Sequence, residues 1–330
     1  MMYALLAGGF IILLVGGDFM VRGAVALAQK LDVPPLVIGL TIIALGTSAP
    51  EFVVSVKSVL NDAPGLAVGN VVGSNIANIL LVLGLPAIIF PIACTGSSLN
   101  RDNLVMILTS LLFIAFCWGG VLVTWQGALF LALLAGFLIH AYRAALRGDG
   151  DLADAEDDFD GVSGFPTSLP ISILMIVAGM IGLIAGAQML VVGAIDVART
   201  FGVSEAVIGL TVVALGTSLP ELTTSLVAAM RKHADVAIGN VVGSNLFNIL
   251  GVIGATSLLM PVPVPAEILN FDLWVMLAAS LLLVPFVLRR APIGRLTGVA
   301  FTIAYIAYIG SQFGDHGITM AALMPITGGQ

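Results

Sequence analysis

Apolar stretches long enough to cross a membrane follow one another along almost the whole chain, separated by short polar segments. A helix needs about 20 mainly apolar residues to span the hydrocarbon core of a bilayer. We place ten such spans, at about residues 3–29, 36–60, 64–90, 102–119, 121–146, 168–198, 205–230, 235–260, 272–288 and 294–313. The pattern predicts an all-α integral membrane protein with ten transmembrane helices.

The acidic segment 147–167 is a hydrophilic stretch that divides the chain into a five-helix repeat at 1–146 and a second at 168–330. Because five is odd, the second half must enter the membrane in the opposite direction from the first. Such inverted-topology repeats are typical of secondary transporters. We interpret 147–167 itself as a solvated cytoplasmic linker, since its acidic residues do not fit the ligand spacing of an EF-hand.

The two halves also share sequence. Residues 36–84 align with 206–254 at an offset of 170 without a gap, and 26 of the 49 aligned positions are identical. The similarity continues outside these segments, where Gly17–Pro35 aligns with Ala187–Glu205. The identities gather around one acidic residue in each copy, which favours an ion-translocating site built from both halves.

Composition agrees with a membrane protein and narrows the choice of partners. The chain is 59% hydrophobic and 9% charged, whereas a soluble domain has about 25% charged residues. Its formal net charge is −7, but seven of the 19 acidic residues lie between Asp149 and Asp160, so a nucleic-acid partner is not indicated. Cys94 and Cys117 are too few to form a disulfide framework.

Basic residues predict the orientation of the chain, because they accumulate on the cytoplasmic side. With the N-terminus outside, only Lys57 and Arg199 fall on the outer side. The other ten are Arg22, Lys30, Arg101, Arg143, Arg147, Arg231, Lys232, Arg289, Arg290 and Arg295. We therefore predict that both termini lie outside. The first 20 residues lack a basic n-region and continue into further apolar sequence, which indicates a retained first span.

One block in each half places a proline beside a glutamate, at Gly46–Glu51 and at Gly216–Glu221. Inside a helix, Pro50 or Pro220 frees the carbonyl four residues earlier. At membrane depth a freed carbonyl must face protein, water or an ion. A proline kink alone is common in membrane helices, but here it is duplicated and joined to a carboxylate. The same turns add the hydroxyl groups of Thr47, Ser48, Thr217 and Ser218.

The carboxylates of Glu51 and Glu221 are the strongest candidates for ion ligands. An ionisable group at mid-bilayer costs ~2.5–3.5 kcal/mol even on a mild insertion scale, and it usually marks a transport pathway. Within the two spans, Lys57 is the basic residue nearest to either of them. A bound cation is therefore the natural partner. The alternative, a protonated Glu, would indicate proton coupling.

A second block in each half, GNVVGSN followed three residues later by another Asn, supplies further oxygen atoms. Residues four apart share a helix face, which groups Ser74 with Asn78 and Ser244 with Asn248. The glycines of the block favour close helix packing. Asn75 lies one position off that face, and either direct ligation or a hydrogen bond to the broken helix fits it.

Together these groups form an all-oxygen set of ligands without His or Cys. Hard cations such as Ca²⁺, and Na⁺ in smaller subsets, suit such ligands, whereas zinc and copper do not. Two carboxylates would balance one Ca²⁺ or hold two or more Na⁺ in adjacent subsites. An antiporter requires that Ca²⁺ and Na⁺ cannot occupy the site at the same time.

Two other classes of protein fit the sequence less well. An intramembrane serine hydrolase would use Ser48 or Ser218 as its nucleophile, but it needs a nearby base. No His or Lys lies at matching depth, so we do not expect an enzyme. A passive cation channel can also contain inverted repeats, and it would pass Ca²⁺ without a counter-ion.

An acidic and a basic residue face each other within the first span. Asp18 and Arg22 are four residues apart, and the equivalent positions of the second half are Gln188 and Val192. We interpret them as an i,i+4 ion pair near the cytoplasmic end. The alternative is a role in gating.

The paired GTSxPE and GNVVGSN blocks resemble the α1 and α2 repeats of the Na⁺/Ca²⁺ exchangers, within the cation/Ca²⁺ exchanger superfamily. The chain most resembles the short prokaryotic members. The resemblance implies Na⁺/Ca²⁺ antiport across a plasma membrane by alternating access, in which the first and sixth spans slide past a static core. The transported ions are then Ca²⁺ and Na⁺, no cofactor is implied, and a monomer should suffice because each half supplies one side of the site.

The resemblance also implies roles for individual residues. The implied ligands are Glu51, Glu221, Thr47, Ser48, Thr217, Ser218, Ser74, Ser244 and the backbone carbonyls of Ala44 and Ala214. One departure concerns Asn248, whose position is an Asp in several exchangers, and the first repeat also carries an amide, at Asn78. Two central carboxylates remain rather than three, which bears on K⁺ dependence and on the Na⁺ stoichiometry. The proton-coupled branch shows a different motif around its Glu, so Na⁺ is the favoured counter-ion and H⁺/Ca²⁺ exchange the nearest alternative.

Overall fold

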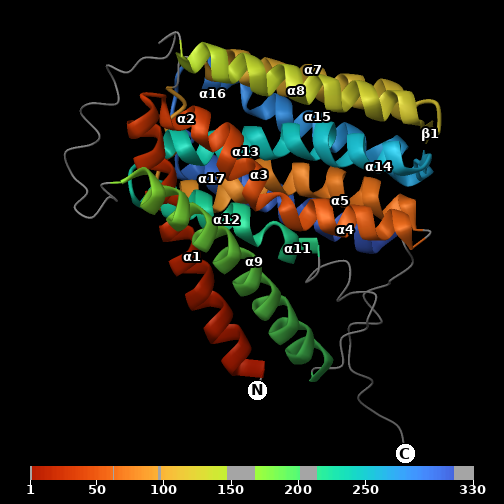
Figure 1. Cartoon of the computed structure of the whole chain (residues 1–330). Coiled ribbons are helices and arrows are strands. Elements are labelled where there is room, and N and C mark those ends of the chain that lie inside the picture. The colour runs from red at the N-terminus through yellow and green to blue at the C-terminus, as the bar shows by residue number, and fades with distance from the viewer. Residues whose placement is uncertain (1, 62, 96–97, 147–167, 201–213, 316–330) are drawn as a thin grey trace, which may run out of the picture.

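A computed structural model describes residues 2–61, 63–95, 98–146, 168–200 and 214–315. The predicted linker 147–167 lies outside the described residues, as does the start of the seventh predicted span. The described chain is almost entirely helical, and its helices fall where the ten spans were predicted (Figure 1). The all-α prediction is therefore confirmed.

The first half contains five spans. They are α1 (Met2–Leu31); α2 (Pro35–Ile38), η1 (Gly39–Ile43), α3 (Ala44–Thr47) and α4 (Ala49–Leu60); α5 (Pro64–Ala77), η2 (Asn78–Leu83) and α6 (Gly84–Ile89); α7 (Leu99–Cys117); and α8 (Thr124–Leu146). The segments η1 and η2 are π-helical turns. Such turns often occur at functional sites within helices.

The second half repeats this plan. Its elements are α9 (Leu169–Thr200); α11 (Ala214–Thr217) and α12 (Leu219–Met230); α13 (Ala234–Leu246), η4 (Phe247–Ile253) and α14 (Gly254–Leu259); η5 (Ile268–Asp272), α15 (Leu273–Leu282) and α16 (Val284–Leu288); and α17 (Arg295–Asp315). A short antiparallel pair, β1 (Val121–Leu122) and β2 (Val262–Pro263), joins the two halves at one end.

By length and composition, seven of the described helices can each cross a membrane. An eighth span is bent: Pro35–Thr47 and Ala49–Leu60 meet at an angle of 43°. The bend falls at Ser48, and α4 begins immediately after it with Pro50 in its first turn. A proline fits the first turn of a helix because the N–H that it lacks would have no partner there. The predicted break is confirmed.

The third and eighth spans form the centre of the molecule. Most residues of Ala234–Leu259 and of Pro64–Ile89 are buried. Close packing around α13 depends on Gly239 and Gly243, because a Cβ at these positions would lie 2.7 Å from the Leu36 carbonyl oxygen and 2.4 Å from that of Leu40. The glycine block therefore serves close packing in the second repeat. In the first repeat the prediction is wrong, because a Cβ at Gly73 would meet nothing within 4 Å and one at Gly69 would make only an ordinary contact with Ile268 at 3.6 Å.

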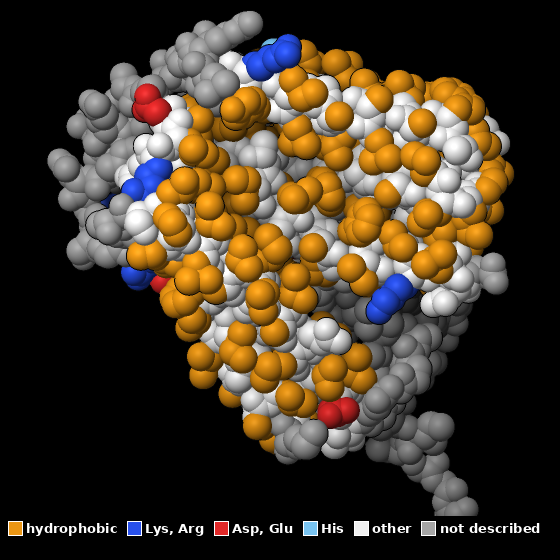
Figure 2. Space-filling model, viewed as in Figure 1, with side chains coloured by type: hydrophobic (Ala, Val, Ile, Leu, Met, Phe, Trp, Pro, Cys, Tyr) orange, Lys and Arg blue, Asp and Glu red, His pale blue; other side chains and the backbone are white. Residues whose placement is uncertain are grey.

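The first and sixth spans, α1 and α9, pack side by side and project together beyond the other helices (Figure 1). They are antiparallel, since Gly9 lies against Gly186 and Gly23 against Ser172. Equivalent helices of the two repeats thus run in opposite directions, which confirms the inverted topology. Hydrophobic side chains cover most of the described surface on the face shown in Figure 2, as contact with lipid requires.

We expect Gly179→Ala to destabilise the protein, because the added Cβ would lie 2.6 Å from the Met20 nitrogen and 2.7 Å from the Gly16 carbonyl oxygen. Overpacking of this kind costs about 1–3 kcal/mol. The measurement is the thermal unfolding midpoint of the purified protein in detergent. Gly136→Ala is the matched control, since a Cβ there meets nothing within 4 Å. Equal midpoints for the two variants would contradict the close contact of α1 with α9.

Candidate functional site

The two predicted carboxylates lie at equivalent places in the two repeats. Glu51 is in the first turn of α4 and Glu221 in the first turn of α12, and both are 0% exposed. Ser48, three residues before Glu51, contacts the Glu221 carboxylate, which links the surroundings of the two glutamates. The structure therefore brings together the two residues on which the sequence analysis depended most.

Hydroxyl groups of one repeat face the carboxylate of the other. The Ser48 hydroxyl donates to Glu221 Oε1 at 3.2 Å. Thr217, from the second repeat, is a neighbour of Glu51, while Ser218 is buried beside it in the chain. Each carboxylate is therefore surrounded partly by the opposite half of the molecule.

The Thr47 hydroxyl lies at the junction of the two repeats. It is 3.1 Å from Asn240 Oδ1, 3.4 Å from the Ser244 hydroxyl and 3.4 Å from the Ala44 carbonyl oxygen. That carbonyl also accepts the Ser48 N–H at 3.0 Å. Three of the predicted ligands from the first repeat therefore contact the second repeat or one another.

A backbone bond also closes the turn at the break of the second repeat. The Ser218 N–H donates to the carbonyl of Leu215 at 3.1 Å.

Four asparagines meet between α5–η2 and α13–η4. Asn78 Nδ2 donates to Asn245 Oδ1 at 3.0 Å, and Asn248 Nδ2 donates to the Ser74 hydroxyl at 3.0 Å and to Asn75 Oδ1 at 3.1 Å. The predicted pairing of Ser74 and Asn78 on one face holds, but the structure adds a partner from the opposite repeat to each.

The sequence analysis missed the first asparagine of the GNVVGSN block. Asn70 Nδ2 donates to the Ser55 hydroxyl at 2.9 Å and to the Glu51 carbonyl at 3.2 Å. Asn240 makes the equivalent bonds, to the Ser225 hydroxyl at 3.2 Å and to the backbone carbonyl of its own repeat's glutamate at 3.5 Å. These bonds fix the start of α4 and α12 against the neighbouring span. The same residue types, Asn and Ser, occupy these positions in both repeats, and this repetition is the signal from which the pairs could have been predicted.

Several buried oxygen atoms at this centre have no hydrogen-bond partner among the described residues. They are Glu51 Oε1 and Oε2, Glu221 Oε2, Asn78 Oδ1, Asn248 Oδ1 and the Ser218 hydroxyl. Within the described chain neither glutamate forms an ion pair. Burying polar atoms without partners costs free energy, and a cation would supply the missing interaction to all of them. Carboxylate, amide and hydroxyl oxygens are ligands of hard cations.

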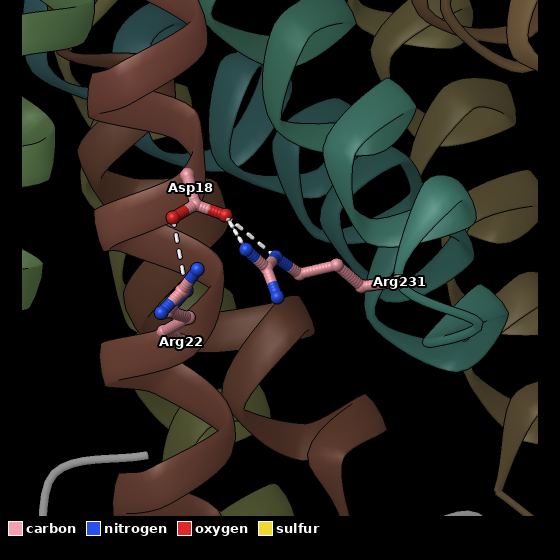
Figure 3. Close-up of polar contacts among 3 residues, drawn as sticks. All are labelled: Asp18, Arg22 and Arg231. Carbon is pink, nitrogen blue, oxygen red and sulfur yellow. Dashed lines mark hydrogen bonds and ion pairs between the residues drawn. The ribbon is translucent and has the colours of Figure 1, made fainter. Parts of the chain in front are cut away.

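A second charged cluster lies away from these oxygens, between α1 and the end of α12 (Figure 3). Arg22 Nε lies 2.9 Å from Asp18 Oδ2, as the spacing predicts. Arg231 Nε donates to Asp18 Oδ1 at 2.6 Å, a contact that the sequence analysis did not anticipate. Asp18 therefore joins the first repeat to the second.

Comparison with known proteins places these features in a family. A family model described as "Sodium/calcium exchanger protein" matches residues 1–143 and 171–314. The chain is 35% identical over 312 residues to "Inner membrane protein YrbG" of Escherichia coli (strain K12), covering 93% of this chain and 95% of that protein. It is 32% identical to "Sodium/calcium exchanger MaX1" of Methanosarcina acetivorans, covering 93% and 97%.

A solved structure agrees with the fold over most of the molecule. The sodium-calcium exchanger NCX_Mj, soaked with 2.5 mM Na⁺ and 0.1 mM Ca²⁺, is 34% identical in sequence and superimposes with a TM-score of 0.80. The match covers 94% of this chain and 98% of that one.

We expect Asp18→Asn to lower the stability of the protein, because it leaves two guanidinium groups, 30% and 21% exposed, facing a neutral amide. The expected loss is about 1–2 kcal/mol, between the values of exposed and buried pairs. Arg231→Gln should cost less, since Arg22 keeps its partner. Thermal unfolding in detergent measures both effects, with Asp196→Asn in α9 as the charge-matched control. A midpoint for Asp18→Asn equal to that of the control would contradict the interaction.

Proposed function

Because this chain belongs to the sodium/calcium exchanger family, we propose that it is a secondary active antiporter that exchanges Na⁺ for Ca²⁺ across a membrane. The observation that carries the proposal is the pair Glu51 and Glu221, fully buried, supplied by opposite repeats and linked through Ser48. Among the described residues, several oxygens of the proposed ligands have no hydrogen-bond partner. Alternating access would expose this central site to each side of the membrane in turn.

The proposed ligands are the oxygen atoms at the centre of the two repeats. They are the carboxylates of Glu51 and Glu221, the amide oxygens of Asn78 and Asn248, the hydroxyls of Thr47, Ser48, Thr217, Ser218, Ser74 and Ser244, and the carbonyls of Ala44 and Ala214. The contacts of Ser48 and Thr47 across the repeat boundary support this assignment. So does the freedom of both amide oxygens.

Charge balance explains why the two cargoes would exclude each other. Two ionised carboxylates carry a charge of −2, which one Ca²⁺ neutralises completely. The same oxygens can instead be shared among Na⁺ ions, each needing fewer ligands. Since both loads draw on Glu51 and Glu221, release of one must precede binding of the other, and this competition couples the two fluxes.

We propose that the α1–α9 pair is the moving element. These helices pack against each other along their length, while α1 meets the rest of the protein mainly through α12 and α2. The glycine contacts between them would let the pair move as one unit. Because α12 carries Glu221 in its first turn, sliding of the pair over α12 would open or cover the site.

The proposal extends to placement in the cell. We place both termini outside, the segment 147–167 in the cytoplasm and the protein in a prokaryotic plasma membrane. The convergence of Arg22 and Arg231 on Asp18 supports this orientation, since the basic-residue pattern assigns both arginines to the same side. A monomer would contain the whole site, and transport would need no cofactor and no enzymatic step.

The deciding experiment is uptake of radioactive Ca²⁺ by proteoliposomes loaded with Na⁺ and diluted into choline. We expect uptake that requires internal Na⁺. Glu51→Gln and Glu221→Gln should each reduce its rate by roughly 100-fold or more, because removing one partner of a buried charge interaction costs about 3–5 kcal/mol and each 1.4 kcal/mol is worth tenfold. Glu267→Gln, an exposed carboxylate in the same chain, is the control and should transport normally.

Other results would point to another mechanism. Uptake that is indifferent to Na⁺ but driven by a pH gradient would contradict Na⁺ coupling and favour H⁺/Ca²⁺ exchange. Ca²⁺ entry that needs no counter-ion at all would indicate a channel. Normal transport by both glutamine variants would place the pathway elsewhere in the molecule.

A further inference from the structure

We propose that Asn75 and Asn245 are positioning residues that orient the amides of Asn248 and Asn78, so that the amide oxygens face the transported cation. This inference rests on the proposed function, because it concerns ligands of the same site. All four side chains are 1% exposed or less, and they lie in the two spans that form the centre of the molecule.

The orientation begins at the backbone. Asn75 Nδ2 donates to the backbone carbonyl of Asn245 at 3.3 Å, and Asn245 Nδ2 donates to the backbone carbonyl of Asn75 at 3.5 Å. A thioether sulfur also lies near each amide nitrogen, Met276 at 3.8 Å and Met106 at 3.6 Å. Carbonyl oxygens and thioether sulfurs only accept hydrogen bonds. Each amide must therefore turn its NH₂ group toward them and its oxygen away.

This first pair then determines the orientation of the second. Asn75 Oδ1 accepts from Asn248 Nδ2 at 3.1 Å, and Asn245 Oδ1 accepts from Asn78 Nδ2 at 3.0 Å. The side-chain oxygens of Asn75 and Asn245 carry no hydrogen and can only accept. The amides of Asn248 and Asn78 must therefore turn their NH₂ groups toward these oxygens. Their own oxygens consequently point in the opposite direction. In this way the positions of two backbone carbonyls determine where the side-chain oxygens of Asn78 and Asn248 point.

The oxygens released in this way are those that lack partners. Asn78 Oδ1 and Asn248 Oδ1 are buried without a hydrogen bond among the described residues. The segment η4, which carries Asn248, packs against α4, and η2, which begins with Asn78, packs against α12. These helices carry Glu51 and Glu221 in their first turns. Each amide thus lies on a segment that packs against the carboxylate helix of the opposite repeat.

The same hydrogen bonds distinguish the positioning asparagines, Asn75 and Asn245, from the proposed ligands, Asn78 and Asn248. Both ends of the Asn75 amide are engaged, its nitrogen by the backbone and its oxygen by Asn248. The buried oxygens without a partner among the described residues include those of Asn78 and Asn248 but not that of Asn75, so we assign Asn75 to act through its neighbour. The direct ligand role left open for Asn75 by the sequence is replaced by one of orientation.

The test is a set of double-mutant cycles on Ca²⁺ affinity, measured by calorimetry on the purified chain in detergent. We expect Asn75→Ala and Asn248→Ala each to weaken Ca²⁺ binding about tenfold. Their combination should also weaken it only about tenfold, because the second change removes a group that is already misoriented. The crossed combination of Asn75→Ala with Asn78→Ala should weaken it clearly more than the matched one, since the Asn75 oxygen accepts from Asn248 and the Asn78 amide donates to Asn245.

The opposite repeat supplies an independent cycle. Asn245→Ala should couple more strongly to Asn78→Ala than to Asn248→Ala, because Asn245 accepts directly from Asn78. Asn75→Ser is the conservative variant: its hydroxyl can still accept from Asn248, so most of the affinity should return. Size-exclusion profiles and unfolding midpoints identify a variant that does not fold, in which case the cycle on the other repeat decides.

Two results would overturn the proposal. One is equal additivity in matched and crossed pairs, which would show that these asparagines only stabilise packing. The other is a wild-type chain that does not bind Ca²⁺, which would overturn the proposed function as well. A wild-type chain that binds Ca²⁺ but shows no Na⁺-driven uptake would contradict the exchange function alone, and the cycles would still test the orientation of the amides.

Discussion

Glu51 and Glu221 place two ionisable groups in the most buried part of an apolar molecule, and the rest of the structure can be understood from that constraint. An uncompensated charge in such surroundings costs several kcal/mol. Among the described residues, the neighbouring side chains supply oxygen atoms rather than positive charges, and several of these oxygens have no hydrogen-bond partner there. The protein is therefore built to be completed by an ion that arrives and leaves, instead of by a permanent countercharge.

Exchange of contacts between the repeats is the means by which the site is assembled. Ser48 of the first repeat donates to Glu221 of the second, and Thr47 contacts Asn240 and Ser244. Neither half contains a complete site. A shift of helices that contact both repeats must consequently alter the surroundings of both carboxylates, which is how helix movement can be linked to ion affinity.

Much of this arrangement is predictable from the sequence. The spans follow from apolar length, and the broken helices follow from Pro50 and Pro220, because the local chemistry of proline acts within one turn. The prediction that Glu51 and Glu221 are central follows from the free-energy cost of burying a carboxylate, which does not require knowledge of the tertiary structure. Inverted topology follows from parity alone.

Contacts that depend on the relative placement of distant helices could not be predicted in the same way. Asp18 and Arg231 are 213 positions apart, and no periodicity connects them. Asn75 and Asn78 look alike in the sequence, and only the crossing of α5 with α13 reveals that one amide is anchored to a backbone carbonyl while the other has a free oxygen. The pairing of Asn70 with Ser55 was visible as a shared identity of both repeats, but identity does not distinguish a ligand from a support.

The Asp18 cluster has a consequence for the balance between the two orientations of the transporter. If the inverted halves were identical, exchanging their conformations would give a state of equal free energy, and an empty site would face each side half of the time. Asp18, Arg22 and Arg231 correspond to Gln188, Val192 and Asn61 in the opposite halves, so this set of charges can assemble at one end of the molecule and not at the other. The resting preference of the protein is thus adjustable at residues that never touch an ion, and selection can tune it without altering what is transported.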